Sequence, residues 1–306
     1  MSKPTWVVCT ALVALVVAVT TLVLFCLTTK NETKRVHLLY FLAALGPPNL
    51  PLKRNILQKN LTMLRAQPDV ATLDVVLNTY GQMDQLSWLE ADVRAAAPGC
   101  RIYRYHKDKA VLVQLWQKDN PHMATLRAAS NRYDHVVFVL DDVRIDKLDA
   151  AHFARTYRQM DLDIMSPVVH GSTHSFGVFD FNEQTDHQNK AGPMVQPTNV
   201  CEFFLYFCSH KAFFRLIDRY DCENPWMWGY DLLLGFWKFR TAVVSSGQVT
   251  HLLQDSSRHN NRKSQCMTKF LLKNGFSSTN SLIKLFPAKI SPPFSLSNNN
   301  PYERTH

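Results

Sequence analysis

The sequence predicts an α/β protein in which helices flank a mixed β-sheet, and three observations support this fold class. Apolar runs rich in Val, Leu and Phe alternate with helical patterns along most of the chain. The run 135–140 is apolar after its histidine and is followed by two acids, as is typical of a central strand buried on both faces. The 306 residues are 46% hydrophobic and 19% charged, which excludes collagen-like and wholly disordered proteins.

Turn-forming and capping residues delimit the expected elements. The segment 46–49 interrupts the first strand, Pro98 and Gly99 end the second helix, and Asn120 before Pro121 is a favourable start for the third. The expected strands are 36–45, 73–79, 101–105, 135–140, 163–169, 202–208 and 241–252. The expected helices are 55–65, 82–97, 121–132, 147–160, 210–220 and 230–239, and the polar stretch 171–198 predicts no element.

The N-terminal segment differs in composition from the rest. Residues 6–27 carry no charge and, as a helix, would cover about 33 Å, enough for a bilayer core. The run does not end in small residues at a cleavage site, so the sequence predicts one uncleaved N-terminal transmembrane helix. We therefore expect a short tail at 1–5, the anchor at 6–27, a polar tether at 28–35, one domain at 36–290 and a loose tail at 291–306.

Charges on both sides of the anchor leave its orientation open. Lys3 precedes the anchor and three basic residues between positions 30 and 35 follow it, which slightly opposes a domain outside the cytosol. We favour a single-pass type II arrangement, with a short cytosolic N-terminus and the domain in the lumen of the Golgi or endoplasmic reticulum. Two glycosylation sequons, at Asn31 and Asn60, would be meaningful in that compartment.

Charge and cysteine content narrow the classes of partner. The formal net charge is +9, and residues 255–306 supply +6 of it, from eight basic residues and two acids. Such a tail suits nucleic acid, acidic lipid or a pyrophosphate, but no zinc-finger spacing or Arg-rich recognition helix occurs, which disfavours nucleic acid. Five cysteines lie outside the anchor without a CxxC; one disulfide stays open, and buried free thiols are favoured.

Two adjacent acids follow the most apolar predicted strand. In open α/β sheets ligands bind beyond the carboxyl ends of the strands, where Asp141 and Asp142 are expected. Carboxylates placed there can hold a divalent cation against a diphosphate. A role in turning the chain and capping the next helix explains the two residues equally well.

An aromatic turn and a histidine add two further candidate sites. The segment 224–231 places Trp228 and Gly229 before Asp231, and indole faces pack against sugar rings while a carboxylate in a partly apolar pocket can accept a hydroxyl proton. A tryptophan-rich core corner, with Asp231 as a charge at a helix N-terminus, is the simpler alternative. His251, at the end of the last strand, could offer a nitrogen ligand to an ion such as Mn²⁺, although lone histidines are usually structural.

These patterns, in this order, resemble those of GT-A-type glycosyltransferases. More closely, the chain looks like a plant and bacterial glycosyltransferase-like family of unknown function and related domains of large algal viruses. The resemblance covers roughly residues 73–254. The segments that carry it are 133–143, 164–167, 200–204, 228–231 and 249–251.

The resemblance implies a GT-A-like (Rossmann-like) fold and a donor site. In such enzymes an acidic motif at a strand end holds Mn²⁺ or Mg²⁺ and the nucleotide-sugar diphosphate. That role falls on Asp142, with Asp141 beside it, and His251 matches a late metal ligand. The full motif would place an acid where Leu140 stands, so the resemblance implies fewer carboxylates at the metal here.

The resemblance also implies an acceptor site. Asp231 matches the acid of a Trp-Gly-x-Asp turn that serves acceptor binding or base catalysis, with Trp228 and Gly229 beside the acceptor. Glu202 matches an acid on the strand that faces the acceptor.

Three functions compete at this stage. The first is a membrane-anchored, metal-dependent, inverting glycosyltransferase that moves a sugar from a nucleotide-diphosphate sugar to a hydroxyl of a glycan or glycoprotein. The second is an inactive GT-A-fold protein that binds carbohydrate or acts as a scaffold, which the missing acid at Leu140 favours. The third, a metal-dependent hydrolase, is disfavoured because no HxH, HExxH or GxSxG spacing occurs.

Overall fold

The computed structural model describes residues 35–107, 121–170, 194–224, 227–252, 260–287, 290 and 294–295. The predicted anchor, the Asn31 sequon and most of the predicted C-terminal tail lie outside these residues. Within them, no helix has the length and apolar character needed to cross a bilayer. The chain from Val36 onward forms one unit, described here by itself.

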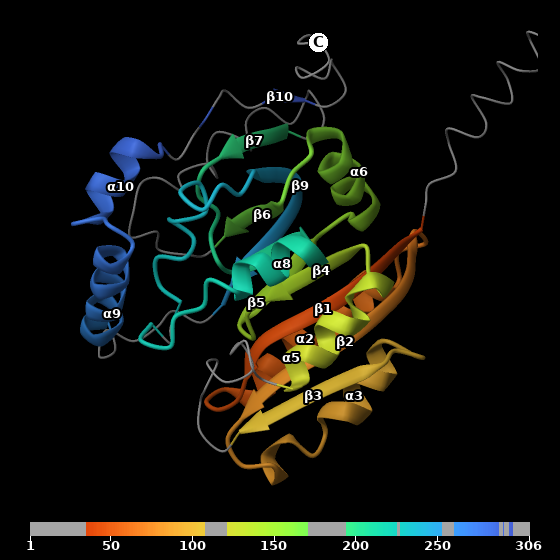
Figure 1. Ribbon diagram of the computed structural model, residues 1–306. Helices are drawn as coiled ribbons and strands as arrows, with labels where there is room; N and C mark the ends of the chain where they lie inside the picture. Colours follow the sequence, from red (N-terminus) through yellow and green to blue (C-terminus); the bar gives the residue numbers. More distant parts are fainter. Residues whose placement is uncertain are drawn as a thin grey trace, which may run out of the picture. The chain divides into compact units, whose positions relative to one another are not determined.

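A large mixed sheet organises this unit (Figure 1). Its strands follow the order β10-β7-β9-β6-β8-β4-β1-β2-β3, and β5 pairs with β9 off this path. Strands β4, β1, β2 and β3 run parallel, β8 lies antiparallel between β4 and β6, and β6 runs parallel to β9. The bounds are β1 Val36–Leu45, β2 Val70–Tyr80, β3 Ile102–Lys107, β4 His135–Val139, β5 Val143–Lys147, β6 Ile164–His170, β7 Met194–Thr198, β8 Leu205–Ser209, β9 Thr241–His251 and β10 Phe294–Ser295.

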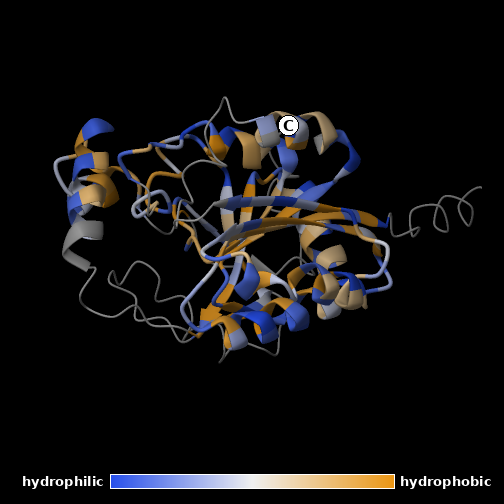
Figure 2. Cartoon of the chain, turned by 90° about the horizontal axis from the view of Figure 1, so that it is seen from below, coloured by the Kyte–Doolittle hydropathy of each residue, from blue (hydrophilic) through white to orange (hydrophobic). Residues whose placement is uncertain are grey.

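Helices cover both faces of the sheet. The described α-helices are α2 Leu50–Arg65, α3 Leu89–Ala96, α5 Pro121–Ala129, α6 Ala150–Met160, α8 His210–Ile217, α9 Asn260–Lys273 and α10 Thr279–Leu285. Successive side chains of β1 enter opposite cores: Phe41 belongs to the core that includes residues of α5, α8 and α9, whereas Tyr40 belongs to the core that includes residues of α2, α3 and α6. Both faces of the central strands are therefore apolar, and the strands at the centre of the sheet are coloured mostly as hydrophobic in Figure 2.

The predicted α/β fold, with a mixed sheet flanked by helices, is confirmed, and several strands fall where the pattern placed them. β1 matches its expected range, while β4 and β9 each end one residue early. The strand β5 and the helices α9 and α10 were not expected, and β7 lies in the stretch for which no element was predicted. The helix expected at 147–160 begins only at Ala150, because β5 takes the preceding residues and the Asp149 carboxylate accepts the His152 N–H at 2.8 Å.

The helix predicted at 230–239 is wrong. This segment is a succession of turns, closed by bonds such as Leu233 N–H to Tyr230 O at 3.2 Å. Tyr230 is fully buried and stacks on Phe270 of α9 at 4.5 Å. Gly235 lies against Asn199, where a Cβ on Gly235 would meet the Asn199 side chain at 2.5 Å. The apolar residues are thus buried on several sides, which a single amphipathic helix face does not allow.

The structure also bears on the Asn60 glycosylation sequon and on the state of the cysteines. Asn60 is fully buried and its side chain is hydrogen-bonded inside the domain, so the sequon at Asn60 cannot carry a glycan in this fold. Cys100, Cys201 and Cys208 are buried free thiols, and Cys222 and Cys266 are free as well.

Candidate functional site

The pairing of β5 with β9 brings two predicted metal ligands together. Val143, the first residue of β5, is registered with His251, the last residue of β9, and the Leu252 N–H donates to the Asp142 carbonyl at 3.0 Å. As a result the His251 Nε2 lies 3.1 Å from the Asp142 Oδ2. The other carboxylate oxygen of Asp142, Oδ1, is buried and has no hydrogen-bond partner in the described part of the chain.

The imidazole of His251 is held by an aromatic ring. Phe204 stacks on it with ring centroids 4.4 Å apart and planes 24° from parallel. The carbonyl of Phe204 in turn accepts the N–H of Leu140, which directly precedes the two acids. The segment before β8 therefore fixes the orientation of His251 toward Asp142.

The second acid of the pair has a different partner. The Asp141 Oδ2 lies 2.7 Å from the Nζ of Lys53, which also donates to the Gly46 carbonyl at 2.8 Å. Lys53 is 5% exposed, so the pair is almost dry. Burial raises the pKa of Asp141 to about 6, the ammonium of Lys53 opposes this rise, and the Asp142 charge adds to it.

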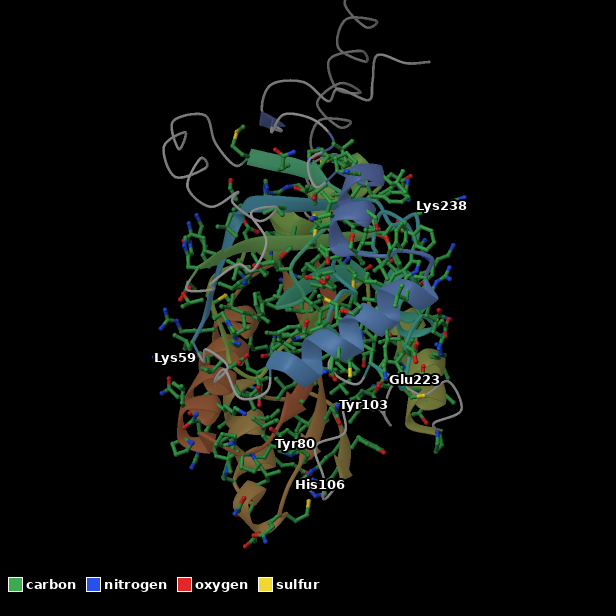
Figure 3. The ribbon with its side chains drawn as sticks, turned by 90° about the vertical axis from the view of Figure 1, so that its left-hand side faces the viewer. Lys59, Tyr80, Tyr103, His106, Glu223 and Lys238 are labelled. Carbon is green, nitrogen blue, oxygen red and sulfur yellow. The ribbon has the colours of Figure 1, made fainter. Side chains whose placement is uncertain are left out.

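Tyr80 borders this acid pair and closes the loop after β1. Its hydroxyl donates to the Pro47 carbonyl at 2.8 Å. Burial raises the pKa of Tyr80 to about 12, with contributions from the charges of Asp141 and Asp142. Figure 3 looks onto the edge of the sheet where β1, β2 and β3 end, and Tyr80 and His106 are labelled on it.

A second acidic cluster forms around Asp231. Burial raises the pKa of Asp231 to about 7, the nearby charge of Glu202 adds to the rise, and backbone hydrogen bonds at Leu232, Asp231 and Gly229 oppose it. Asp231 is partly exposed and stands in the turns of 230–239, so its interpretation as a charge at a helix N-terminus is wrong. Glu202 precedes β8 rather than lying on a strand, which corrects the expected position.

The turn that carries Asp231 is fixed under α9. Gly229 has φ +88°, and a Cβ there would meet the Met267 Cγ of α9 at 3.0 Å. The carbonyl of Trp228 accepts the Asn224 Nδ2–H at 2.7 Å. The indole side chain of Trp228 is partly exposed. Two of the predicted acceptor residues, Trp228 and Gly229, therefore lie on one turn beside Asp231, whereas Glu202 lies before β8.

The segment 201–204 connects the two clusters. Glu202 faces Asp231, and Phe204, two residues further on, stacks on His251. Two residues of extended chain span no more than about 7 Å. The segment thus has the acid-histidine pair near its Phe204 end and the carboxylate of Asp231 near its Glu202 end.

The sequence interpretation missed Lys53, Tyr80 and Phe204. A signal for Lys53 exists, because this lysine falls on the apolar face of α2 with Ile56, Leu57 and Leu64. A lysine at such a position is rarely buried without a charge partner. Tyr80 and Phe204 carry no comparable signal, since aromatic residues near strand ends are common in cores.

Comparison with known proteins returned structural neighbours only. No family model and no curated protein matches the chain. The chain is similar in structure to glycosyltransferases. A crystal structure of GalNAc-T7 with UDP, GalNAc and Mn²⁺ has a TM-score of 0.48 at 8% identity, covering 83% of this chain and 57% of that one. The mannosyltransferase PcManGT from Pyrobaculum calidifontis, in complex with GDP-Man and Mn²⁺, has 0.49 at 14%, covering 78% and 64%.

A third neighbour, A197 from STIV, has a TM-score of 0.32 at 10% identity and covers 72% of this chain and 86% of that one. The chain thus spans less than two thirds of the length of the two named glycosyltransferases. These values are too low to carry an activity from any of the three proteins to this chain.

A divalent cation fits the acid-histidine pair only with help from a ligand. No group of three or more His, Cys, Asp and Glu side chains among the described residues could hold a metal ion. Asp142 and His251 offer two donors, and the buried, unpaired Oδ1 of Asp142 is a further free acceptor. Mg²⁺ and related ions are commonly held by one or two carboxylates together with substrate phosphates and water, so the pair fits a cation that arrives with a diphosphate.

Proposed function

We propose that the chain is a glycosyltransferase that moves a sugar from a nucleotide-diphosphate sugar to a hydroxyl of a glycan or glycoprotein. The observation that carries this proposal is the pairing of two unlike acidic clusters across segment 201–204: Asp142 with His251, and Asp231 with Glu202. Group transfer from a diphosphate needs one place where the leaving group is neutralised and another where a proton is accepted. The two clusters are suited to these two tasks, and segment 201–204 joins them.

Asp142 and His251 form the donor end of the site. Their side chains would hold Mn²⁺ or Mg²⁺ and, with it, the diphosphate of the donor. When bound, such a cation supplies charge neutralisation for the leaving diphosphate. Asp141 positions its neighbour Asp142, because the ion pair of Asp141 with Lys53 holds this part of the chain in place.

Asp231 is the proposed general base. A carboxyl with a pKa of about 7 is a far better proton acceptor than an ordinary aspartate, whose pKa is near 4, and it is still largely ionised just above neutral pH. It accepts the proton of the acceptor hydroxyl as that oxygen attacks the anomeric carbon. Attack from the face opposite the diphosphate inverts the anomeric centre, and the partly exposed indole of Trp228 offers an apolar surface for the acceptor sugar.

The proposed cellular setting follows from the sequence. An anchor at 6–27 would make the protein a single-pass type II membrane protein with this domain in the lumen of the Golgi or endoplasmic reticulum. Glycan and glycoprotein acceptors occur in that compartment.

A second candidate, an inactive protein that binds carbohydrate or acts as a scaffold, is favoured by one observation. The site offers a single ionised ligand, because Leu140 replaces an acid and Asp141 is paired with Lys53. Nucleotide binding separates the two functions, since a lectin-like protein binds the sugar without the nucleotide.

Calorimetric titration of the full-length, detergent-solubilised protein with a panel of nucleotide sugars, with and without Mn²⁺, tests the proposal. We expect one nucleotide sugar to bind in a Mn²⁺-dependent manner. Asp142→Ala should abolish this dependence, and His251→Ala should weaken it less, because a neutral ligand is lost while the anionic one remains. Normal Mn²⁺-dependent binding by a folded Asp142→Ala protein would contradict the proposal. Asp146→Ala is the matched control, since Asp146 is exposed on β5 and pairs with Arg144.

A further inference from the structure

Asn60, on the buried face of α2, makes three side-chain hydrogen bonds. Its Nδ2 donates to the Val143 carbonyl at 2.9 Å and to the Tyr40 hydroxyl at 3.2 Å. Its Oδ1 accepts the Ile145 N–H at 2.8 Å. The residue is fully buried, so none of these bonds is shared with bulk water.

These bonds occupy the free edge of β5. Along its other edge β5 pairs with β9, where the Leu252 N–H bonds to the Asp142 carbonyl. In an antiparallel strand, alternate residues direct their N–H and C=O groups to opposite edges, so Val143 and Ile145 face away from β9. One carboxamide thus satisfies the carbonyl of Val143 and the N–H of Ile145 as a neighbouring strand would.

From this arrangement we infer that Asn60 is a positioning residue for the Asp142–His251 pair. β5 begins directly after Asp142, and its register with β9 sets the 3.1 Å separation of the two side chains. With Asn60 on one edge and β9 on the other, β5 has one lateral position. The inference rests on the proposed function, because it assigns this geometry to cation and diphosphate binding.

The chain contains a matched control for this clamp. Gln67, just beyond α2, makes the same two-point contact further along: its Nε2 donates to the Leu148 carbonyl at 2.6 Å, and its Oε1 accepts the Ala150 N–H at 2.8 Å. Gln67→Ala therefore removes a side-chain amide clamp of the same chemistry from the same stretch of chain, away from Asp142. Any general loss of stability should appear in both variants.

The test compares Asn60→Ala, Asn60→Asp and Gln67→Ala in the full-length protein by two measurements. The first is the affinity for Mn²⁺ in the presence of saturating nucleoside diphosphate, measured by electron paramagnetic resonance, and the second is hydrogen exchange of the Leu252 amide. Residues that orient metal ligands typically contribute about 10- to 100-fold in metal affinity. We expect a loss of that size in Asn60→Ala together with faster exchange at Leu252, and a wild-type result for both in Gln67→Ala. Asn60→Asp keeps the acceptor for Ile145 N–H and loses the donor to Val143. Its Mn²⁺ affinity and its exchange rate at Leu252 should therefore lie between those of the wild-type protein and Asn60→Ala.

The outcomes separate this inference from the proposed function. The positioning role is overturned if the Leu252 amide of a folded Asn60→Ala protein exchanges at the wild-type rate. It is also overturned if Asn60→Ala and Gln67→Ala lose Mn²⁺ affinity to the same extent. If Asn60→Ala does not fold, the comparison of Asn60→Asp with Gln67→Ala decides by the same criteria. If the wild-type protein does not bind Mn²⁺ together with a nucleoside diphosphate, the cation of the proposed function fails, whereas the exchange at Leu252 still decides whether Asn60 holds β5.

Discussion

At the scale of single residues, neighbouring acids of this site have unequal surroundings. Asp141 is held by a buried lysine, Asp142 contacts a histidine, and Asp231 lies near Glu202 in the turns that follow Gly229. This difference is why we propose Asp231, whose pKa is raised by burial, as the proton acceptor and Asp142 as the cation ligand. The residue types were recognisable in the sequence, but their partners were not, because Lys53 and Phe204 reach the site from distant parts of the chain.

Asp231→Asn should retain donor binding and lose about 10²- to 10⁴-fold in turnover, because the amide keeps the shape of the carboxylate and removes the base. In the wild-type protein turnover should rise with pH through about 7, since the carboxylate must be ionised to accept a proton. The rate of the variant should lack this rise. Turnover and melting temperature measured on one preparation check this, and a destabilised but fully active variant would rule out the catalytic role.

Lys53→Met should destabilise the domain by about 3 kcal/mol or more, because it leaves the largely buried Asp141 carboxylate, 14% exposed, without its partner. The double variant Lys53→Met/Asp141→Leu should recover most of that loss, since no unpaired charge remains. Urea unfolding of the wild-type protein, both single variants and the double variant measures the coupling. Additive losses would show that the pair is not a stabilising unit.

At the scale of elements, the strands and helices that are most deeply buried were the ones that the sequence predicted best. Strands buried on both faces, such as β1 and β4, appear as unbroken apolar runs and were placed within a residue or so. β5 was missed because the alternation of apolar and charged side chains that indicates a strand lasts only from Val143 to Asp146, too short a run to stand out after the two acids. The segment 230–239 was misassigned because its apolar residues contact several elements, and α9 was missed because most of its residues are polar.

Gly229→Ala tests the contact between the Asp231 turn and α9. The substitution places a Cβ at a positive φ and 3.0 Å from Met267, so we expect a loss of about 1 kcal/mol or more in stability and a larger relative loss in turnover than in donor binding. Met267→Ala in the same protein should relieve the contact but not the backbone strain. If the double variant regained the full wild-type stability, backbone strain at position 229 would be negligible.

At the scale of the whole molecule, the central strands of the sheet are buried on both faces. Residues of α2, α3 and α6 belong to one core and residues of α5, α8 and α9 to the other, while Asp142 lies between β4 and β5 and His251 ends β9. The sequence predicts the place of Asp142 because the acids directly follow a buried strand. It does not predict the junction of the two clusters, which depends on the pairing of β5 with β9 and on the path of 201–204.

Removal of residues 1–34 should leave a folded domain that still binds the donor. β1 begins at Val36, and both of its neighbours, β2 and β4, belong to the same unit. Gel filtration and donor titration of the shortened protein check this. Aggregation under all conditions would show that the domain depends on the removed segment.

Sugar transfer itself is the most direct test of the central claim. The wild-type protein, Asp142→Ala and the control Asp146→Ala are incubated with a panel of nucleotide sugars and a glycan library, and both the released nucleoside diphosphate and the glycosylated product are quantified. We expect the two products in equal amounts from the wild-type and Asp146→Ala proteins, and neither from Asp142→Ala. Release of nucleoside diphosphate without a glycosylated product, or retention of transfer in Asp142→Ala, would contradict the account.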